Sequence, residues 1–171
     1  LHEMTALHIA GKYASENVAA LLIERFKVET LILTDNNKMS ALHHVCKCKL
    51  ERPTVVKKML KRLKLFLSEN SFIEALSAKD RFENTLFDLA IKENHLKIVE
   101  ILFKVNPIYK SICDHELNLP IHIAARFNST LKTLELLEKF DCVSFEVNKN
   151  WDNVFHLAAS TNKLDQIKDL V

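Results

Sequence analysis

Glycine is almost missing from this chain, because Gly11 is the only one among 171 residues against an average usage of about 7%. Proline is also scarce, with three residues. Phosphate-binding loops, dinucleotide-binding turns and glycine-rich sandwiches need glycine at fixed positions, so the composition argues against them. No apolar run approaches the roughly 20 residues that a membrane-spanning helix needs, and we expect no membrane insertion.

Charge of one sign is lacking as well, since the formal net charge is only +2. So small a value gives no chain-wide electrostatic argument for nucleic acid as a partner. The remaining composition, 48% hydrophobic and 27% charged, is typical of a globular, helix-rich protein. The four cysteines are too few and too irregularly spaced for a disulfide framework, which predicts a reduced intracellular setting, cytoplasmic or nuclear.

A six-residue string recurs along the chain. Residues 5–10 (TALHIA) return at 40–45 (SALHHV), 85–90 (TLFDLA), 119–124 (LPIHIA) and 153–158 (NVFHLA). The fourth positions are 8, 43, 88, 122 and 156, so the spacings are 35, 45, 34 and 34. Five copies at nearly constant spacing indicate a repeat architecture.

The recurring string resembles the ankyrin-repeat signature, Thr-Pro-Leu-His-x-Ala in units of about 33 residues, and the resemblance covers essentially the whole chain. It implies an all-α fold with short β-hairpin tips, in which helix-turn-helix units stack into a solenoid. Residues 1–171 are then a single ankyrin-repeat domain. Its units are 1–34, 35–79, 80–113, 114–147 and 148–171, the outer two incomplete. Because neither end resembles a solubilising cap, we expect an excerpt of a longer protein with flanking repeats or domains.

Local features agree with such units. Four strings begin with residues that make good N-caps, namely Thr5, Ser40, Thr85 and Asn153. Pro120 stands at a first helical position, where its missing N–H costs nothing. Where the family has a helix-ending glycine in the left-handed conformation, this chain has asparagine, the next best residue there. These positions are Asn94, Asn128 and Asn162. Amphipathic second helices are predicted after the first two, with apolar stripes at 96–102 and 131–137.

The chain departs from the family pattern in three respects. Glycine at the hairpin tip is replaced, which predicts distorted or strained tips, by Lys38, Glu83, Leu117 and Trp151. Asp88 replaces the usual histidine. The second unit is about eleven residues too long, with the insertion near 61–78. We expect a lengthened second helix there, a turn at 68–71 and a short extra helix at 72–76.

The recurring histidines would need to converge for catalysis or metal binding, whereas a solenoid spreads them along its length. The resemblance implies instead that each imidazole hydrogen-bonds hairpin backbone and ties neighbouring units together. These histidines are His8, His43, His122 and His156. The cluster at 43–48 (HHVCKC) has zinc-ligand residue types, but a structural site needs four ligands and no second pair lies at a suitable spacing. Without a nucleophile elbow, phosphate loop or paired carboxylates, we expect no enzyme, cofactor or metal site here.

Ankyrin repeats usually bind partners through hairpin tips and the last residues of each first helix. Carried over, this implies a protein–protein interaction scaffold whose concave face binds an acidic or mixed apolar–acidic segment of another protein. Basic residues would steer the partner and aromatic residues would anchor it. Phe82 and Trp151 have an alternative interpretation, as fillers of the gaps left by the missing tip glycines. The predicted binding residues are Lys12, Tyr13, Met39, Lys47, Arg81, Phe82, Lys92, Arg126, Phe127, Lys149 and Trp151.

A second basic surface lies on the predicted helix at 54–67. Residues 47–64 carry a net +7, while the rest of the chain carries −5. This surface is interpreted either as a solvated helix face or as a docking site for an acidic partner, nucleic acid, an anionic membrane or an import receptor. Its basic residues are Lys57, Lys58, Lys61, Arg62 and Lys64.

Two more specific roles stay open. The irregular second unit resembles inhibitors that mask Rel-type transcription factors, the IκB group. A cytoplasmic ankyrin array of a channel or other membrane-associated protein is the other alternative, since the absence of end caps fits it.

Overall fold

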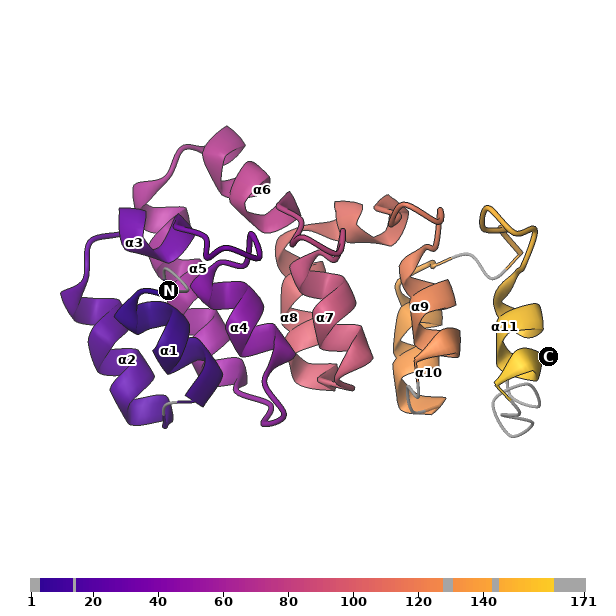
Figure 1. Ribbon diagram of the computed structural model, residues 1–171, viewed down its shortest axis with the longest axis horizontal. Coiled ribbons are helices and arrows are strands. Elements are labelled where there is room, and N and C mark those ends of the chain that lie inside the picture. The colour runs from indigo at the N-terminus through magenta and orange to yellow at the C-terminus, as the bar shows by residue number, and fades with distance from the viewer. Residues whose placement is uncertain (1–3, 14, 128–130, 143–144, 162–171) are drawn as a thin grey trace. The chain divides into compact units, whose positions relative to one another are not determined.

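Residues 4–13, 15–127, 131–142 and 145–161 are described by a computed structural model. These residues are mostly helical (Figure 1), and their β structure amounts to one bridge between Thr34 and Ser40. The all-α class is therefore confirmed. The chain divides into two compact units, Leu1–Leu89 and Ala90–Val171. Within the described ranges, no helix is long and apolar enough to cross a membrane.

The first unit packs short helices around one apolar core. α1 contacts both α2 and α4, and α5 contacts α2, α4 and α6. α1 and α4 approach so closely that a Cβ on Gly11 would lie 2.6 Å from the carbonyl oxygen of Ala41, so the single glycine is needed for this contact. The elements are α1 (Ala6–Tyr13), α2 (Glu16–Arg25), α3 (Glu29–Ile32), α4 (Ala41–Lys47), α5 (Pro53–Phe66) and α6 (Glu69–Ser77). α7 (Leu86–Lys92) spans the boundary of the units.

The second unit packs α9 against both α10 and α11, and α8 against α10 and the 3₁₀ helix η1. The predicted apolar stripes are confirmed, since Ile98, Val99 and Leu102 are buried on α8, and Leu134 and Leu137 on α10. Neither η1 nor α3 was expected from the sequence. The elements are α8 (Leu96–Val105), η1 (Pro107–Ser111), α9 (Pro120–Arg126), α10 (Leu131–Lys139) and α11 (Val154–Ser160).

The predicted capping residues at helix ends agree with the structure wherever it describes them. The four N-cap side chains each accept a hydrogen bond from a backbone N–H of their helix, in Thr5, Ser40, Thr85 and Asn153. Pro120 is the first residue of α9. Asn94 ends α7 with φ = 59°, in the left-handed region as predicted. Asn128 and Asn162 lie outside the described residues.

Four similar turns precede α4, α7, α9 and α11. In each, the side-chain oxygen of the first residue accepts the N–H groups two and four residues later at 2.8–3.0 Å, from Asp35, Asp80, Asp114 and Asn148. The fourth residue of each turn is left-handed, with φ of 57° for Lys38, 62° for Glu83, 60° for Leu117 and 65° for Trp151. The predicted strain at these positions is confirmed, because a non-glycine residue there costs roughly 1–2 kcal/mol.

The insertion in the second predicted unit differs partly from expectation. The lengthened helix is present as α5, which has 14 residues. The expected turn at 68–71 is wrong, since α6 already begins at Glu69. Ser68 is its N-cap, and the Ser68 Oγ accepts the N–H of Ser71 at 3.3 Å. The polar run is therefore a capped first turn rather than a break.

Candidate functional site

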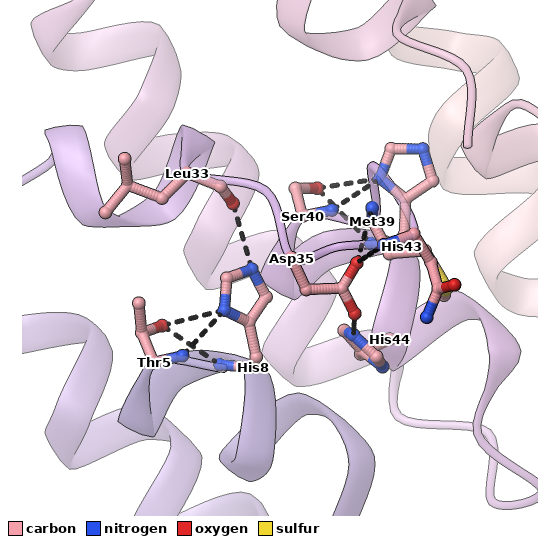
Figure 2. A network of polar contacts seen from close by, with 9 residues as sticks. Thr5, His8, Leu33, Asp35, Met39, Ser40, His43 and His44 are labelled. Carbon is pink, nitrogen blue, oxygen red and sulfur yellow. Dashed lines mark hydrogen bonds and ion pairs between the residues drawn. The ribbon is translucent and has the colours of Figure 1, made fainter. Parts of the chain in front are cut away.

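Three of the recurring histidines make the same pair of backbone contacts. The Nδ1 of His8, His43 and His122 accepts the backbone N–H of the residue three positions earlier, at 3.0–3.1 Å. Each Nε2 lies 2.8–3.2 Å from a distant carbonyl oxygen, of Leu33, Ala78 and Glu146 respectively. Figure 2 shows both contacts of His8 and the Nδ1 contact of His43 with Ser40. Because the backbone N–H can only donate, Nδ1 is unprotonated and Nε2–H donates to the carbonyl.

These imidazoles are therefore structural and neutral. All three are almost fully buried. Burial lowers the pKa of His43 to about 4, against the smaller opposing effect of the Ala78 carbonyl. Burial also lowers the pKa of His122, and the Glu146 carbonyl opposes the change. A charged ring would lose its Nδ1 acceptor, so these side chains are not suited to proton transfer.

The remaining two copies of the string vary this arrangement. The Asp88 Oδ2 accepts both the N–H and the Oγ1–H of Thr85 at 2.8 Å, which reproduces the Nδ1 half of the contact with a carboxylate. His156 is exposed, and its Nδ1 accepts the N–H of Asn153 at 3.2 Å. Local capping is thus retained at all five positions.

A buried acid–histidine pair adjoins the first two histidines (Figure 2). The His44 Nε2 donates to the Asp35 Oδ2 at 3.0 Å, and the His44 ring meets the His8 ring edge-on at 5.6 Å. Burial lowers the pKa of His44, and Asp35 only partly opposes this. Burial raises the pKa of Asp35, but the N–H groups of Met39 and Asn37 together with His44 outweigh it and lower the pKa overall. The pair is thus a carboxylate accepting from a neutral imidazole, and it ties the 35–39 turn to α4.

The two cysteines near these histidines, Cys46 and Cys48, lie in different environments. Cys46 is fully buried, and burial raises the pKa of its thiol to about 12, which leaves it an inert core residue. Cys48 is half-buried at the end of α4. Its Sγ lies 3.4 Å from the Lys12 carbonyl oxygen and 2.8 Å from the Arg52 Nη2. Among the residues that the structure describes, no three His, Cys, Asp or Glu side chains gather as a metal site would require.

Arg52 is a structural residue that the sequence analysis missed. It is buried, and its guanidinium donates to the carbonyl oxygens of Ala10 at 3.2 Å and Gly11 at 2.7 Å. These carbonyls belong to the last turn of α1, where helical partners run out. In the sequence, Arg52 is notable only because it directly precedes Pro53. No sequence pattern identifies the carbonyl groups to which it donates.

The predicted binding residues are exposed or half-buried with one exception. Met39 is only 3% exposed, and its inclusion is wrong, because the 35–39 turn directs it into the core. Tyr13 is 72% exposed, Phe127 41% and Trp151 80%. Phe82 is exposed as well, so the gap-filling alternative for Phe82 and Trp151 is wrong. The other predicted residues with accessible side chains are Lys12, Lys47, Arg81, Lys92, Arg126 and Lys149.

Basic and aromatic groups among these residues lie together at helix ends. The Lys12 ammonium is 4.9 Å from the centre of the Tyr13 ring. In the second unit, the Lys92 ammonium is 4.4 Å from the centre of the Phe127 ring. Arg126 instead forms an ion pair with Glu116 at 2.7 Å, which lowers the pKa of Glu116. Lys12–Tyr13 and Lys92–Phe127 are therefore the accessible cation–aromatic pairs of the set.

A hollow of about 460 Å³ brings several predicted residues of the first unit together. It lies where the ends of α1 and α4 meet the loop at 48–52, and we call it the Lys12–Leu50 pocket. Lys12, Tyr13 and Lys47 line it, together with Lys49 and Leu50, which the sequence analysis did not select. His44, Cys48 and Arg52 complete the lining.

The basic helix α5 is partly structural. Arg62 is half-buried and donates to the carbonyl oxygens of Ile23 and Phe26 at the end of α2, so it is not part of a free charged surface. Lys58 pairs with Glu24 at 3.4 Å. The exposed basic residues are Lys57, Lys58, Lys61 and Lys64, and they adjoin exposed Leu65 and Phe66.

No protein-family model and no curated protein sequence matches this chain.

Proposed function

We propose that the chain is an ankyrin-type repeat array that serves as a protein–protein interaction module. The support for the fold is the recurrence of one contact pattern at the spacing of the strings. The histidine contacts occur in both units, and the four turns share their side-chain bonding and left-handed fourth residue. Adjacent turns are also linked by backbone, from the Arg81 N–H to the Asn37 oxygen and from the Lys149 N–H to the Glu116 oxygen, each at 2.8 Å.

The observation that carries the binding role is the exposure of large aromatic side chains beside basic ones at turns and helix ends. Tyr13, Phe82, Phe127 and Trp151 all expose much of their surface, although aromatic rings contribute most when buried. Aromatic residues dominate the affinity of protein interfaces, whereas basic residues orient a charged partner. An acidic segment with apolar side chains would satisfy both kinds of group.

The hydrogen-bonded scaffold supports this role energetically. The turns that present Phe82 and Trp151 are held by side-chain and backbone bonds, so little ordering is required of this side of a complex. A preformed surface loses less conformational entropy on association and binds more tightly for the same contacts.

The test is affinity capture from nuclease-treated lysate followed by mass spectrometry. The binding variant carries Lys92→Glu, Phe127→Ala and Trp151→Ala, and a matched control of the second unit carries Ile108→Ala and Lys110→Glu, both exposed on η1. Circular dichroism establishes that both are folded. We expect partners that the native chain and the control retain and the binding variant loses. Retention of the same partners by all three proteins contradicts the proposed surface.

A second candidate function rests on α5. Its exposed lysines surround exposed Leu65 and lie next to Phe66, a combination suited to an anionic surface or nucleic acid. Such binding would weaken steeply with added salt and would be lost in a Lys57→Glu, Lys61→Glu, Lys64→Glu variant. It would be indifferent to Phe127→Ala.

A further inference from the structure

The Lys12–Leu50 pocket is built into the packing of the first unit. Gly11 lets α1 and α4 approach closely, since a Cβ there would also lie 3.2 Å from the His44 Cβ. Arg52 then joins the two helix ends, because its Nη2 donates to the Gly11 oxygen at 2.7 Å and to the Cys48 Sγ at 2.8 Å. The Cys48 thiol in turn donates to the Lys12 oxygen at 3.4 Å. The walls are thus held in place without a ligand.

Positive charge predominates at the pocket. Lys12, Lys47 and Lys49 are exposed around it, and none of the lining residues that the structure describes carries a carboxylate. The loop at 48–52 carries one acid, Glu51, which is half-buried between the lining residues Leu50 and Arg52. Asp35 is buried and accepts from His44. The resulting field favours a ligand that carries negative charge at the rim.

The apolar groups at the same place favour a side chain in the centre. Tyr13 is 72% and Leu50 71% exposed, and both line the pocket. Its volume of about 460 Å³ lies within the range of roughly 300–1,000 Å³ for pockets that bind small ligands. One large aliphatic or aromatic side chain, with part of its backbone, would cover these two residues.

A small inorganic anion does not suit the pocket equally well. Arg52, the group best shaped for a bidentate phosphate contact, donates instead to Ala10, Gly11 and Cys48. The lysines stand at the rim, where flexible ammonium groups suit separated carboxylates better than one compact anion.

We propose that the Lys12–Leu50 pocket is the anchor site for an acidic peptide segment, in which one large apolar side chain enters the pocket between flanking Asp or Glu residues. This inference rests on the proposed interaction function and specifies the ligand chemistry of one site. The apolar side chain contacts Tyr13 and Leu50, and the flanking carboxylates lie against Lys12, Lys47 and Lys49.

Selection from a display library of random dodecapeptides tests the ligand chemistry on the full chain. We expect selected peptides to carry a large apolar residue flanked by Asp or Glu. Their affinities are then measured by fluorescence polarisation for a Lys12→Glu, Lys47→Glu pocket variant and for a Lys57→Glu, Lys61→Glu control with the same charge change in the same unit. The pocket variant should bind at least about tenfold more weakly, since like charges then face the acidic ligand, and the control within about twofold of the native chain.

Thiol protection provides a second measurement that needs no substitution. Cys48 lines the pocket, whereas Cys113 is half-buried in the second unit and serves as an internal control. Saturating peptide should slow the alkylation of Cys48 several-fold, as located by mass spectrometry, and leave the alkylation of Cys113 unchanged. This readout stays decisive if the pocket variant fails to fold.

The outcomes separate this inference from the broader function. Selected peptides without acids, or peptides that leave Cys48 unprotected, overturn the pocket assignment. If the selected peptides still bind the pocket variant but lose binding to a Lys92→Glu, Phe127→Ala variant, the interaction function stands and the assignment of the anchor site is wrong. If no peptide is selected and the native chain also captures no partner from lysate, both proposals fail.

Discussion

Acid should destabilise the first unit through His43. The ring is buried with Nδ1 accepting the Ser40 N–H and Nε2 donating to the Ala78 oxygen. Its pKa is lowered by burial from 6.5 to about 4. As the pH falls below about 6.5, the unfolded chain therefore binds a proton that the folded chain does not.

The sign and size follow from that difference. The stabilisation is fully present above about pH 6.5, and it is lost as the pH falls from about 6.5 towards 4. Two and a half pKa units correspond to about 3 kcal/mol in the limit, and to about 2 kcal/mol already near pH 5. Such a loss is a large fraction of the 5–15 kcal/mol typical of folded proteins.

Urea unfolding followed by circular dichroism, at about pH 7.5 and about pH 5, measures the effect. A His43→Gln variant has no ring to titrate, so its stability should fall by about 2 kcal/mol less than that of the native chain over this interval. His156→Gln is the matched control for removing a ring, because His156 holds the same string position but is exposed. Equal losses in the native chain and His43→Gln would refute the reasoning.

Three further substitutions probe the packing of the first unit, each measured as a change in the free energy of unfolding in urea at neutral pH. Arg52→Leu should destabilise the fold by about 2–3 kcal/mol, because the Ala10 and Gly11 carbonyls lose a charged donor. An unchanged urea midpoint would mean that water fully replaces the guanidinium as hydrogen-bond donor. Gly11→Ala should destabilise by about 1–3 kcal/mol, since the new Cβ would lie 2.6 Å from a backbone oxygen, and a gain in stability would contradict the close approach. Lys38→Gly should stabilise the fold by up to about 1 kcal/mol, because glycine adopts the left-handed conformation at φ = 57° without strain. The greater backbone entropy of glycine in the unfolded chain offsets part of this gain. A lower stability would show that the Lys38 side chain contributes more than its conformation costs.

Local features were predictable because they depend on residues close in sequence. An N-cap such as Ser40 bonds an N–H three residues away, and the left-handed Asn94 ends the helix that it follows. The histidines were predictable through the resemblance, which implied a backbone partner but did not identify the carbonyl. The wrong prediction of a turn at 68–71 arose because serine is common both in turns and at helix N-caps. Ser68 suits a turn and a helix N-cap equally, and the helix that follows decides between them.

By itself, the sequence determined the helical class, the spacing of the recurring strings and most helix starts, and the resemblance identified the four strained turn residues. Only the tertiary structure decided which side chains remain accessible. Met39 and Phe82 sit in turns of the same kind but at different places, and the fifth residue is buried in three of the turns while the third is buried in none. Arg52 acquires its role from the α1 carbonyls, about 40 residues away in the chain. The Lys12–Leu50 pocket likewise exists only where α1 and α4 meet, since contacts between distant segments depend on packing rather than on local pattern.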